Sequence, residues 1–158
     1  DREEFFLMPE KIAAIKKYLA EQNIRLLENT GERIKIRGRE IYLSGTKEYV
    51  SHEENVALAF RNAARNELKI LLTHNPDVIY KAMKSGVDLV LSAHTHGGQI
   101  RLPFYGALAK SFTELGRYFD KGWFTFGETK LFISSGLGEA GTRARLFNPP
   151  EIVILNIY

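Results

Sequence analysis

Two short apolar segments that each run into histidine constrain the fold of this 158-residue chain more than any other feature. Residues 69–73 (KILLT) are followed by His74, and residues 88–93 (DLVLSA) are followed by His94 and His96. Continuous apolar runs of this length are typical of parallel strands that are buried on both faces. The sequence therefore predicts two buried strands, each with histidine at its carboxyl end.

The residues between the two runs predict a helix that connects them. Asn75 is suited to an N-cap, Pro76 to the first helical position and Gly86 to the end of the helix. A strand, a helix and a strand in this order predict a βαβ unit, and hence an α/β fold with parallel pairing. The periodicity predicts further elements: a helix from Pro9, strands at 25–28, 33–37, 40–43, 131–134 and 151–157, a helix capped by Ser51 and Glu54, and a long loop at 99–130.

Composition limits the classes of site and partner. The chain has 44% hydrophobic residues and no linker, which predicts a single domain over residues 1–158. It has no cysteine, so a metal must be bound by nitrogen and oxygen ligands. The net charge of +3 suits an anionic substrate and is too small to favour nucleic acid as a partner. No apolar run is long enough to span a membrane and no secretory signal is visible, but this says nothing about the parent protein, whose localisation stays unknown, with the bacterial cytoplasm and a membrane surface both open.

The three histidines at the strand ends predict a metal site. Residues i and i+2 of an extended backbone project to the same side, so His94 and His96 are expected to point together. Neighbouring parallel strands end at the same edge of a sheet, which brings His74 to the same place. Neutral imidazole is the commonest protein ligand of zinc-type metals. The alternative is that these are surface or hydrogen-bonded core histidines.

The acids that could complete such a site are few. Asp77 lies in the first turn of the predicted helix, where it offsets the helix dipole, and Asp88 lies at the opposite end of its strand. Glu139 is expected in a solvated loop, and His52 in an exposed helix cap. The chain therefore carries part of a metal site.

The two histidine motifs resemble a known family. Residues 71–77 (LLTHNPD) and 92–99 (SAHTHGGQ) are similar to the C-terminal half of calcineurin-like metallophosphoesterases, in particular to bacterial phosphodiesterase-like members. The closing residues 135–138, Arg145 and 149–152 also resemble that subgroup, so the resemblance extends from Ile41 to Tyr158. Ala93 departs from the pattern, because the family usually has glycine before the first histidine of the pair.

The resemblance implies a fold, a cofactor and roles for the histidines. It implies the second half of a β-sandwich flanked by helices, with two divalent metals (Mn, Fe, Zn or similar) in the complete enzyme. His74 and His94 would bind one metal and His96 the other. The remaining ligands and the catalytic residues are expected upstream of Asp1, in an N-terminal half that is absent here and would be the main partner of this chain. The chain alone is then expected to be inactive.

The predicted function is therefore metal-dependent hydrolysis of a phosphomonoester or phosphodiester. Gly98 and Arg143 are the candidates for contact with the substrate, and Arg101, Lys110 and Arg145 are further cations that could reach a phosphate. Aromatic residues in the 99–130 segment could form core, a lid or a lipid-facing surface. The alternative function is a non-catalytic metal-binding or interaction domain that holds one structural ion.

Overall fold

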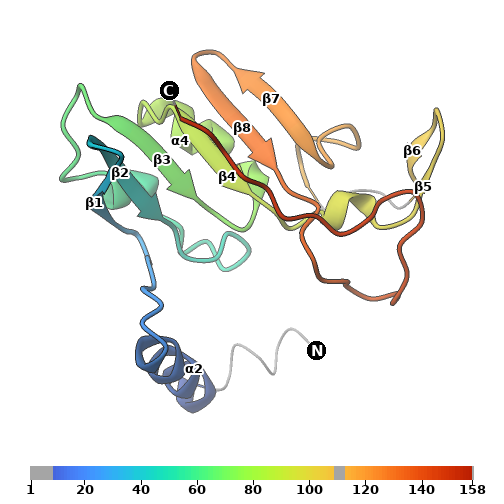
Figure 1. Cartoon of the computed structure of the whole chain (residues 1–158), viewed down its shortest axis with the longest axis horizontal. Helices are drawn as coiled ribbons and strands as arrows, with labels where there is room; N and C mark the ends of the chain where they lie inside the picture. Colours follow the sequence, from blue (N-terminus) through green and yellow to red (C-terminus); the bar gives the residue numbers. More distant parts are fainter. Residues whose placement is uncertain (1–8, 109–112, 158) are drawn as a thin grey trace.

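A six-stranded mixed sheet forms the centre of the chain, in the order β1-β2-β3-β4-β8-β7 (Figure 1). The computed structural model describes residues 9–108 and 113–157, so Asp1 and Lys110 lie outside the described residues. The strands of the sheet are β1 (Thr30–Ile36), β2 (Arg39–Gly45), β3 (Leu68–Leu72), β4 (Leu89–Ser92), β7 (Gly122–Phe126) and β8 (Thr129–Ile133), and a separate hairpin is made by β5 (Arg101–Leu102) and β6 (Gly106–Ala107). The helices are α2 (Pro9–Glu21), α3 (Val56–Ala59) and α4 (Ile79–Lys84), with 3-10 turns η1 (Pro76–Val78) and η2 (His96–Gly98). The predicted α/β class is confirmed.

The four inner strands are parallel, and the two outer strands are antiparallel to their neighbours. β2, β3, β4 and β8 pair in parallel, whereas β1 pairs antiparallel with β2 and β7 with β8. The connection from β3 to β4 passes through η1 and α4, and the Asn75 side chain caps η1 by accepting from the N–H of Asp77 (2.8 Å). The predicted βαβ unit is therefore present, and β3 and β4 end at the same edge of the sheet.

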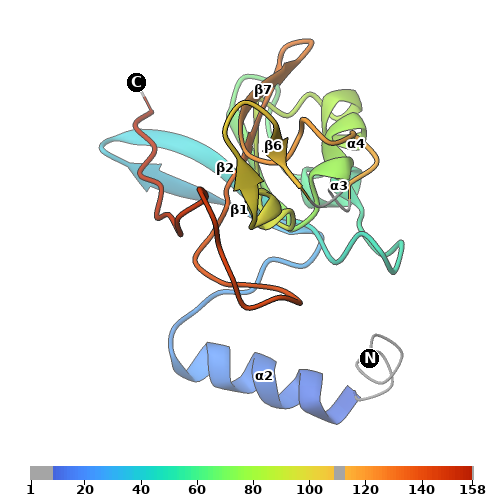
Figure 2. The same cartoon turned by 90° about the vertical axis from the view of Figure 1, so that its right-hand side faces the viewer.

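The two faces of the sheet differ in burial. Leu71, Val90 and Leu131 are fully buried on the face that α3 and α4 cover (Figure 2). On the other face, a depression of about 570 Å³ is lined by apolar residues of β3, β4 and β8 together with Val153 and Leu155. Leu72 on this face remains 39% exposed. Successive side chains along a strand point to opposite faces of the sheet, so each strand contributes to the buried face and to this half-covered face.

Helix α2 lies apart from the sheet in both views (Figures 1 and 2). It begins at Pro9, as the sequence predicts, but it buries no residue. Its apolar positions Ile12, Ile15 and Tyr18 are 37%, 49% and 60% exposed. In the part of the chain that is described, no helix is both long and apolar enough to cross a bilayer.

Two predictions about local structure between residues 51 and 130 are wrong. The second helix is capped by Asn55, whose side chain accepts from the N–H of Leu58, and Glu54 instead pairs with Lys81. The 99–130 segment is not one loop, because it contains the β5–β6 hairpin and strand β7. Strand β7 is stabilised by pairing with β8 across a turn at Gly127, which has φ +60°. Sequence periodicity in β7 is weak because its aromatic residues occur on both faces.

The strand predicted at 151–157 is absent from the structure. The segment is apolar, with Ile152 and Ile154 at 80% and 84% exposed, and it crosses the half-covered face of the sheet (Figure 1). A strand needs hydrogen bonds from a neighbouring strand, and none of the described strands pairs with this segment. Glu151 nevertheless anchors its beginning, because Oε1 accepts from the N–H of Ser135 (2.7 Å) and the hydroxyl of Ser134 (3.2 Å).

This anchor predicts a pH-dependent contribution to stability. The hydrogen bond from the Ser135 N–H lowers the pKa of Glu151. A carboxylate with a depressed pKa stabilises the fold above its unfolded-state pKa, and this contribution disappears as pH falls through the folded-state value. Glu151→Gln is therefore expected to lower the melting temperature at neutral pH and to match the wild type in acid. A difference between the two proteins that persists unchanged to low pH would contradict this assignment.

Candidate metal centre

His74 and His94 come together where β3 and β4 end. Each histidine follows the last residue of its strand by two positions. The carbonyl of His74 accepts from the N–H of Ala93 (3.2 Å) and from the hydroxyl of Ser92 (3.0 Å), which fixes the two strand ends to each other. The His94 Nδ1 and His74 Nε2 atoms are 3.2 Å apart, and the ring centroids are 5.0 Å apart with the planes nearly perpendicular. Two ring nitrogens at this distance can share a proton or a bound cation.

His96 lies on the same loop but faces a different neighbour. The assumption that residues 94–96 are extended is wrong, because β4 ends at Ser92 and both histidines have left-handed backbones, with φ +67° at His94 and +51° at His96. The Nδ1 atom of His96 lies 3.3 Å from the carbonyl oxygen of Gly138. A carbonyl only accepts, so the ring donates from Nδ1 and keeps the lone pair on Nε2 for another ligand. Left-handed non-glycine residues are strained and concentrate at functional sites.

The electrostatic surroundings favour neutral imidazole at His74. Partial burial lowers the pKa of His74, and repulsion from His94 and His96 lowers it further, whereas Glu48 opposes the change. The neutral form is the one that binds a metal. Glu48 is exposed and lies in the loop after β2. No sequence pattern indicates that this residue lies near His74.

The acids considered from the sequence lie elsewhere. Asp77 is buried, and its Oδ1 accepts from the N–H groups of Glu114 (3.0 Å) and Leu115 (3.3 Å), so it anchors that loop. Asp88 accepts from the N–H of Lys69 (2.7 Å) at the amino end of the strands, and Glu139 is exposed. His52 is exposed in the turn before α3.

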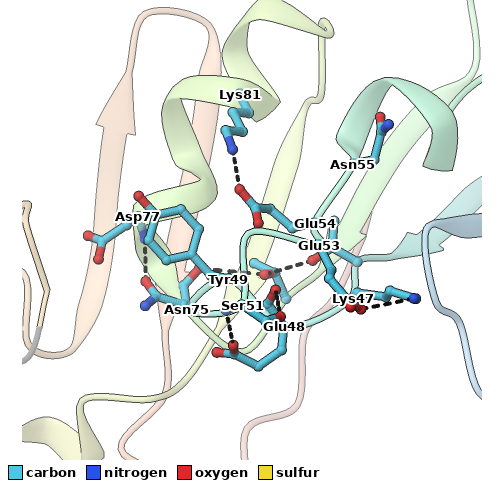
Figure 3. A network of polar contacts seen from close by, with 12 residues as sticks. Lys47, Glu48, Tyr49, Ser51, Glu53, Glu54, Asn55, Asn75, Asp77 and Lys81 are labelled. Atoms are coloured by element: carbon cyan, nitrogen blue, oxygen red, sulfur yellow. Dashed lines mark hydrogen bonds and ion pairs between the residues drawn. The ribbon is translucent and has the colours of Figure 1, made fainter. Parts of the chain in front are cut away.

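The polar network behind this edge of the sheet serves packing. Lys81 of α4 pairs with Glu54, whose side chain is fully buried, and the Lys81 ammonium lies 5.7 Å from the centre of the Tyr49 ring (Figure 3). Burial raises the pKa of Tyr49, and the charges of Glu114 and Asp77 add to this effect. These contacts join the loop after β2 to α4, and none of them involves His74, His94 or His96.

The residues predicted to contact the substrate occupy different positions. Gly98 lies in the histidine loop, with φ +73°, and Arg143 is exposed. Arg101 pairs with Asp120 and donates to the carbonyl of Gly97 (3.1 Å). Arg145 donates to backbone carbonyls, among them that of Ser135 at 2.8 Å. Arg101 and Arg145 therefore support the loop in this structure.

The donor set fits part of a metal site. The imidazoles of His74 and His94 meet at the carboxyl ends of the parallel strands. The imidazole of His96 contacts the Gly138 carbonyl through Nδ1, so this contact does not use its Nε2 lone pair. No group of three or more histidine, cysteine, aspartate or glutamate side chains that could hold a metal occurs within residues 9–108 and 113–157. A closed structural site would need about four protein ligands, whereas the described residues bring two imidazole nitrogens to within 3.2 Å of each other.

Several curated proteins are similar to this chain. An uncharacterized metallophosphoesterase of Bacillus subtilis, YkuE, is 39% identical over 88 residues, which cover 56% of this chain and 30% of the relative. A second from the same organism, YkoQ, is 27% identical over 98% of this chain and 57% of its own length. The UDP-2,3-diacylglucosamine pyrophosphatase LpxG of Chlamydia muridarum is 32% identical over 73% of this chain and 36% of its own length.

The chain spans between about a third and somewhat more than half of the length of these three relatives. No family model matches the sequence, and the search of solved structures found no match. Two of these three relatives are named metallophosphoesterases, and the third is named a pyrophosphatase. The chain is thus similar to a part of the length of curated metallophosphoesterases, the family that its two histidine motifs resemble.

Proposed function

We propose that this chain carries one half of the active site of a metal-dependent phosphoesterase that hydrolyses phosphomonoesters or phosphodiesters with two divalent metals. The observation that carries the proposal is the approach of His94 Nδ1 to His74 Nε2, 3.2 Å apart at the carboxyl ends of adjacent parallel strands. Open α/β sheets bind their ligands at this edge. In this proposal His74 and His94 hold one metal and His96 holds the other.

The metals supply Lewis acidity that stabilises charge on the phosphoryl oxygens. The imidazoles of this chain bind and orient the metals. Gly98 and Arg143 are the proposed contacts for the substrate. The Chlamydia relative is named for hydrolysis of a pyrophosphate bond, and hydrolysis at phosphorus is the chemistry that we propose for this chain as well.

The remaining ligands are proposed to come from a segment outside these 158 residues. Three observations support this. The described residues contain no complete group of ligands, and the sheet face beside His74 is apolar and half-covered, with Leu72 39% exposed. The relatives are longer than the matched region. We infer that an additional part of the same protein packs on this face and completes the site.

The test compares the full-length protein with residues 1–158 alone. The full-length protein is expected to hydrolyse bis(p-nitrophenyl) phosphate or p-nitrophenyl phosphate. This activity is expected to disappear when a chelator removes the metals and to return when Mn²⁺ or Zn²⁺ is added. Residues 1–158 alone are expected to bind at most one metal and to be no faster than buffer that contains metal. Activity of the full-length protein that survives complete metal removal would contradict the metal role, and robust metal-dependent turnover by residues 1–158 would contradict the shared site.

A further inference from the structure

The loop that carries His96 has an unfavourable backbone that other residues must hold in place. His96, Gly97 and Gly98 follow one another with φ of +51°, +60° and +73°. A left-handed residue other than glycine is strained and persists only where its surroundings over-determine it. The contacts to the backbone of His96 therefore indicate what keeps its imidazole in position.

Asn148 makes the shortest of these contacts. Its Nδ2 donates to the carbonyl of His96 (2.8 Å), and its Oδ1 accepts from the ammonium of Lys121 (2.9 Å). Because an ammonium group only donates, the amide oxygen must face Lys121 and the amide nitrogen must face His96. Asn148 is 1% exposed, so its orientation is fixed by packing as well as by hydrogen bonds.

Arg145 connects the same carbonyl to the turn behind the imidazole. One terminal nitrogen, Nη1, lies 3.4 Å from the carbonyl oxygen of His96. The other, Nη2, donates to the carbonyls of Ser135 (2.8 Å) and Gly138 (2.5 Å). The Gly138 oxygen is also the acceptor that lies 3.3 Å from Nδ1 of His96. Arg145 thus holds both the backbone of His96 and the group that sets the tautomer of its ring.

We propose that Arg145 and Asn148 are positioning residues that fix the rotamer and the Nδ1–H tautomer of His96 and thereby aim its Nε2 at a divalent metal. The inference rests on the proposed function. Groups that orient a metal-binding histidine through its second nitrogen typically change metal affinity tenfold to a hundredfold. A planar guanidinium suits this role, because it presents five donors in a fixed fork, whereas an ammonium is a compact charge with three rotatable donors.

The test uses Arg145→Ala, Arg145→Lys and Asn148→Ala in the full-length protein. Each variant is expected to bind Zn²⁺ about ten to a hundred times more weakly in chelator competition. Nitrogen-15 NMR of the metal-free protein at about pH 8, above the ordinary imidazole pKa, is expected to show Nδ1–H at His96 in the wild type and a tautomer mixture in the variants. Arg145→Lys keeps the charge and most of the side-chain volume, so it tests the fork even if Arg145→Ala folds poorly.

Arg117→Ala is the matched control. Arg117 also donates to backbone carbonyls, those of Tyr105 and Ala107, both at 3.3 Å, and neither belongs to the histidine loop. The control is expected to keep the metal affinity and the His96 tautomer of the wild type. Variants of Arg145 and Asn148 that lose thermal stability but keep both properties would overturn the positioning role. A wild-type protein that binds no divalent metal would contradict the proposed function, and the tautomer measurement would still decide the positioning role.

Discussion

Replacing His94 by alanine in the full-length protein is expected to reduce kcat by more than about a hundredfold. Residues that only orient a metal ligand are already worth tenfold to a hundredfold, and removal of a ligand itself should exceed that. His94 also lies 3.2 Å from His74, so its loss disturbs the second imidazole of the pair. His96→Ala is expected to be similarly damaging, because in the proposed function both metals would act on the same phosphoryl group. The measurement is kcat together with metal content per protein.

His52→Ala is the control for these two variants. His52 is exposed in a turn, and its ring packs edge-on against Tyr49 with the centroids 6.3 Å apart. It is expected to keep kcat and metal content close to those of the wild type. If His52→Ala were as damaging as His96→Ala, or if His96→Ala kept full kcat, the histidine pair after β4 would no longer be a candidate for the catalytic metals.

The parts of the fold that the sequence predicts correctly are those determined locally. The β3–α4–β4 unit follows from two apolar runs, a cap at Asn75 and a glycine at the end of the helix. The position of His74 and His94 at one edge of the sheet then follows from parallel pairing alone. Each of these signals lies within a few residues of the element it specifies, so single-sequence reasoning can find it.

The failures concern elements that depend on distant partners. The 151–157 segment has strand-like composition, but a strand forms only where another strand offers its hydrogen-bonding edge. The sequence does not predict strand β7, because this strand depends on pairing with β8 rather than on its own periodicity. The capping-box spacing at Ser51 was misleading because Glu54 is drawn into a pair with Lys81, 27 residues away.

The same distinction applies to the candidate site. The sequence identifies the three histidines. The prediction that residues 94–96 are extended fails, however, because the loop contains left-handed residues. The contacts that hold His96 come from Arg145 and Asn148, which are 49 and 52 residues further along the chain. No local spacing connects such residues, and a cation near a phosphate site is more readily interpreted as a substrate contact than as a support for the backbone.

Gly97→Ala is expected to destabilise the protein by about 2–5 kcal/mol, through both backbone strain and a clash. Gly97 has φ +60°, which costs an alanine about 1–2 kcal/mol. An added Cβ would also lie 2.8 Å from both side-chain polar atoms of Asn148 and from Cβ of Ser135. Asn148 cannot move aside without breaking its hydrogen bonds to His96 and Lys121.

Gly141→Ala separates the two causes. Gly141 has φ +68°, close to that of Gly97, but an added Cβ there would meet no heavy atom within 4 Å. This variant is therefore expected to lose only the strain contribution of about 1–2 kcal/mol in urea unfolding. Equal losses for the two variants would show that the loop relaxes around the new methyl group. A larger loss at Gly97, accompanied by weaker Zn²⁺ binding that Gly141→Ala does not share, would tie the close approach of Asn148 to the positioning of His96, because the added methyl group meets Asn148 at Gly97 and nothing within 4 Å at Gly141.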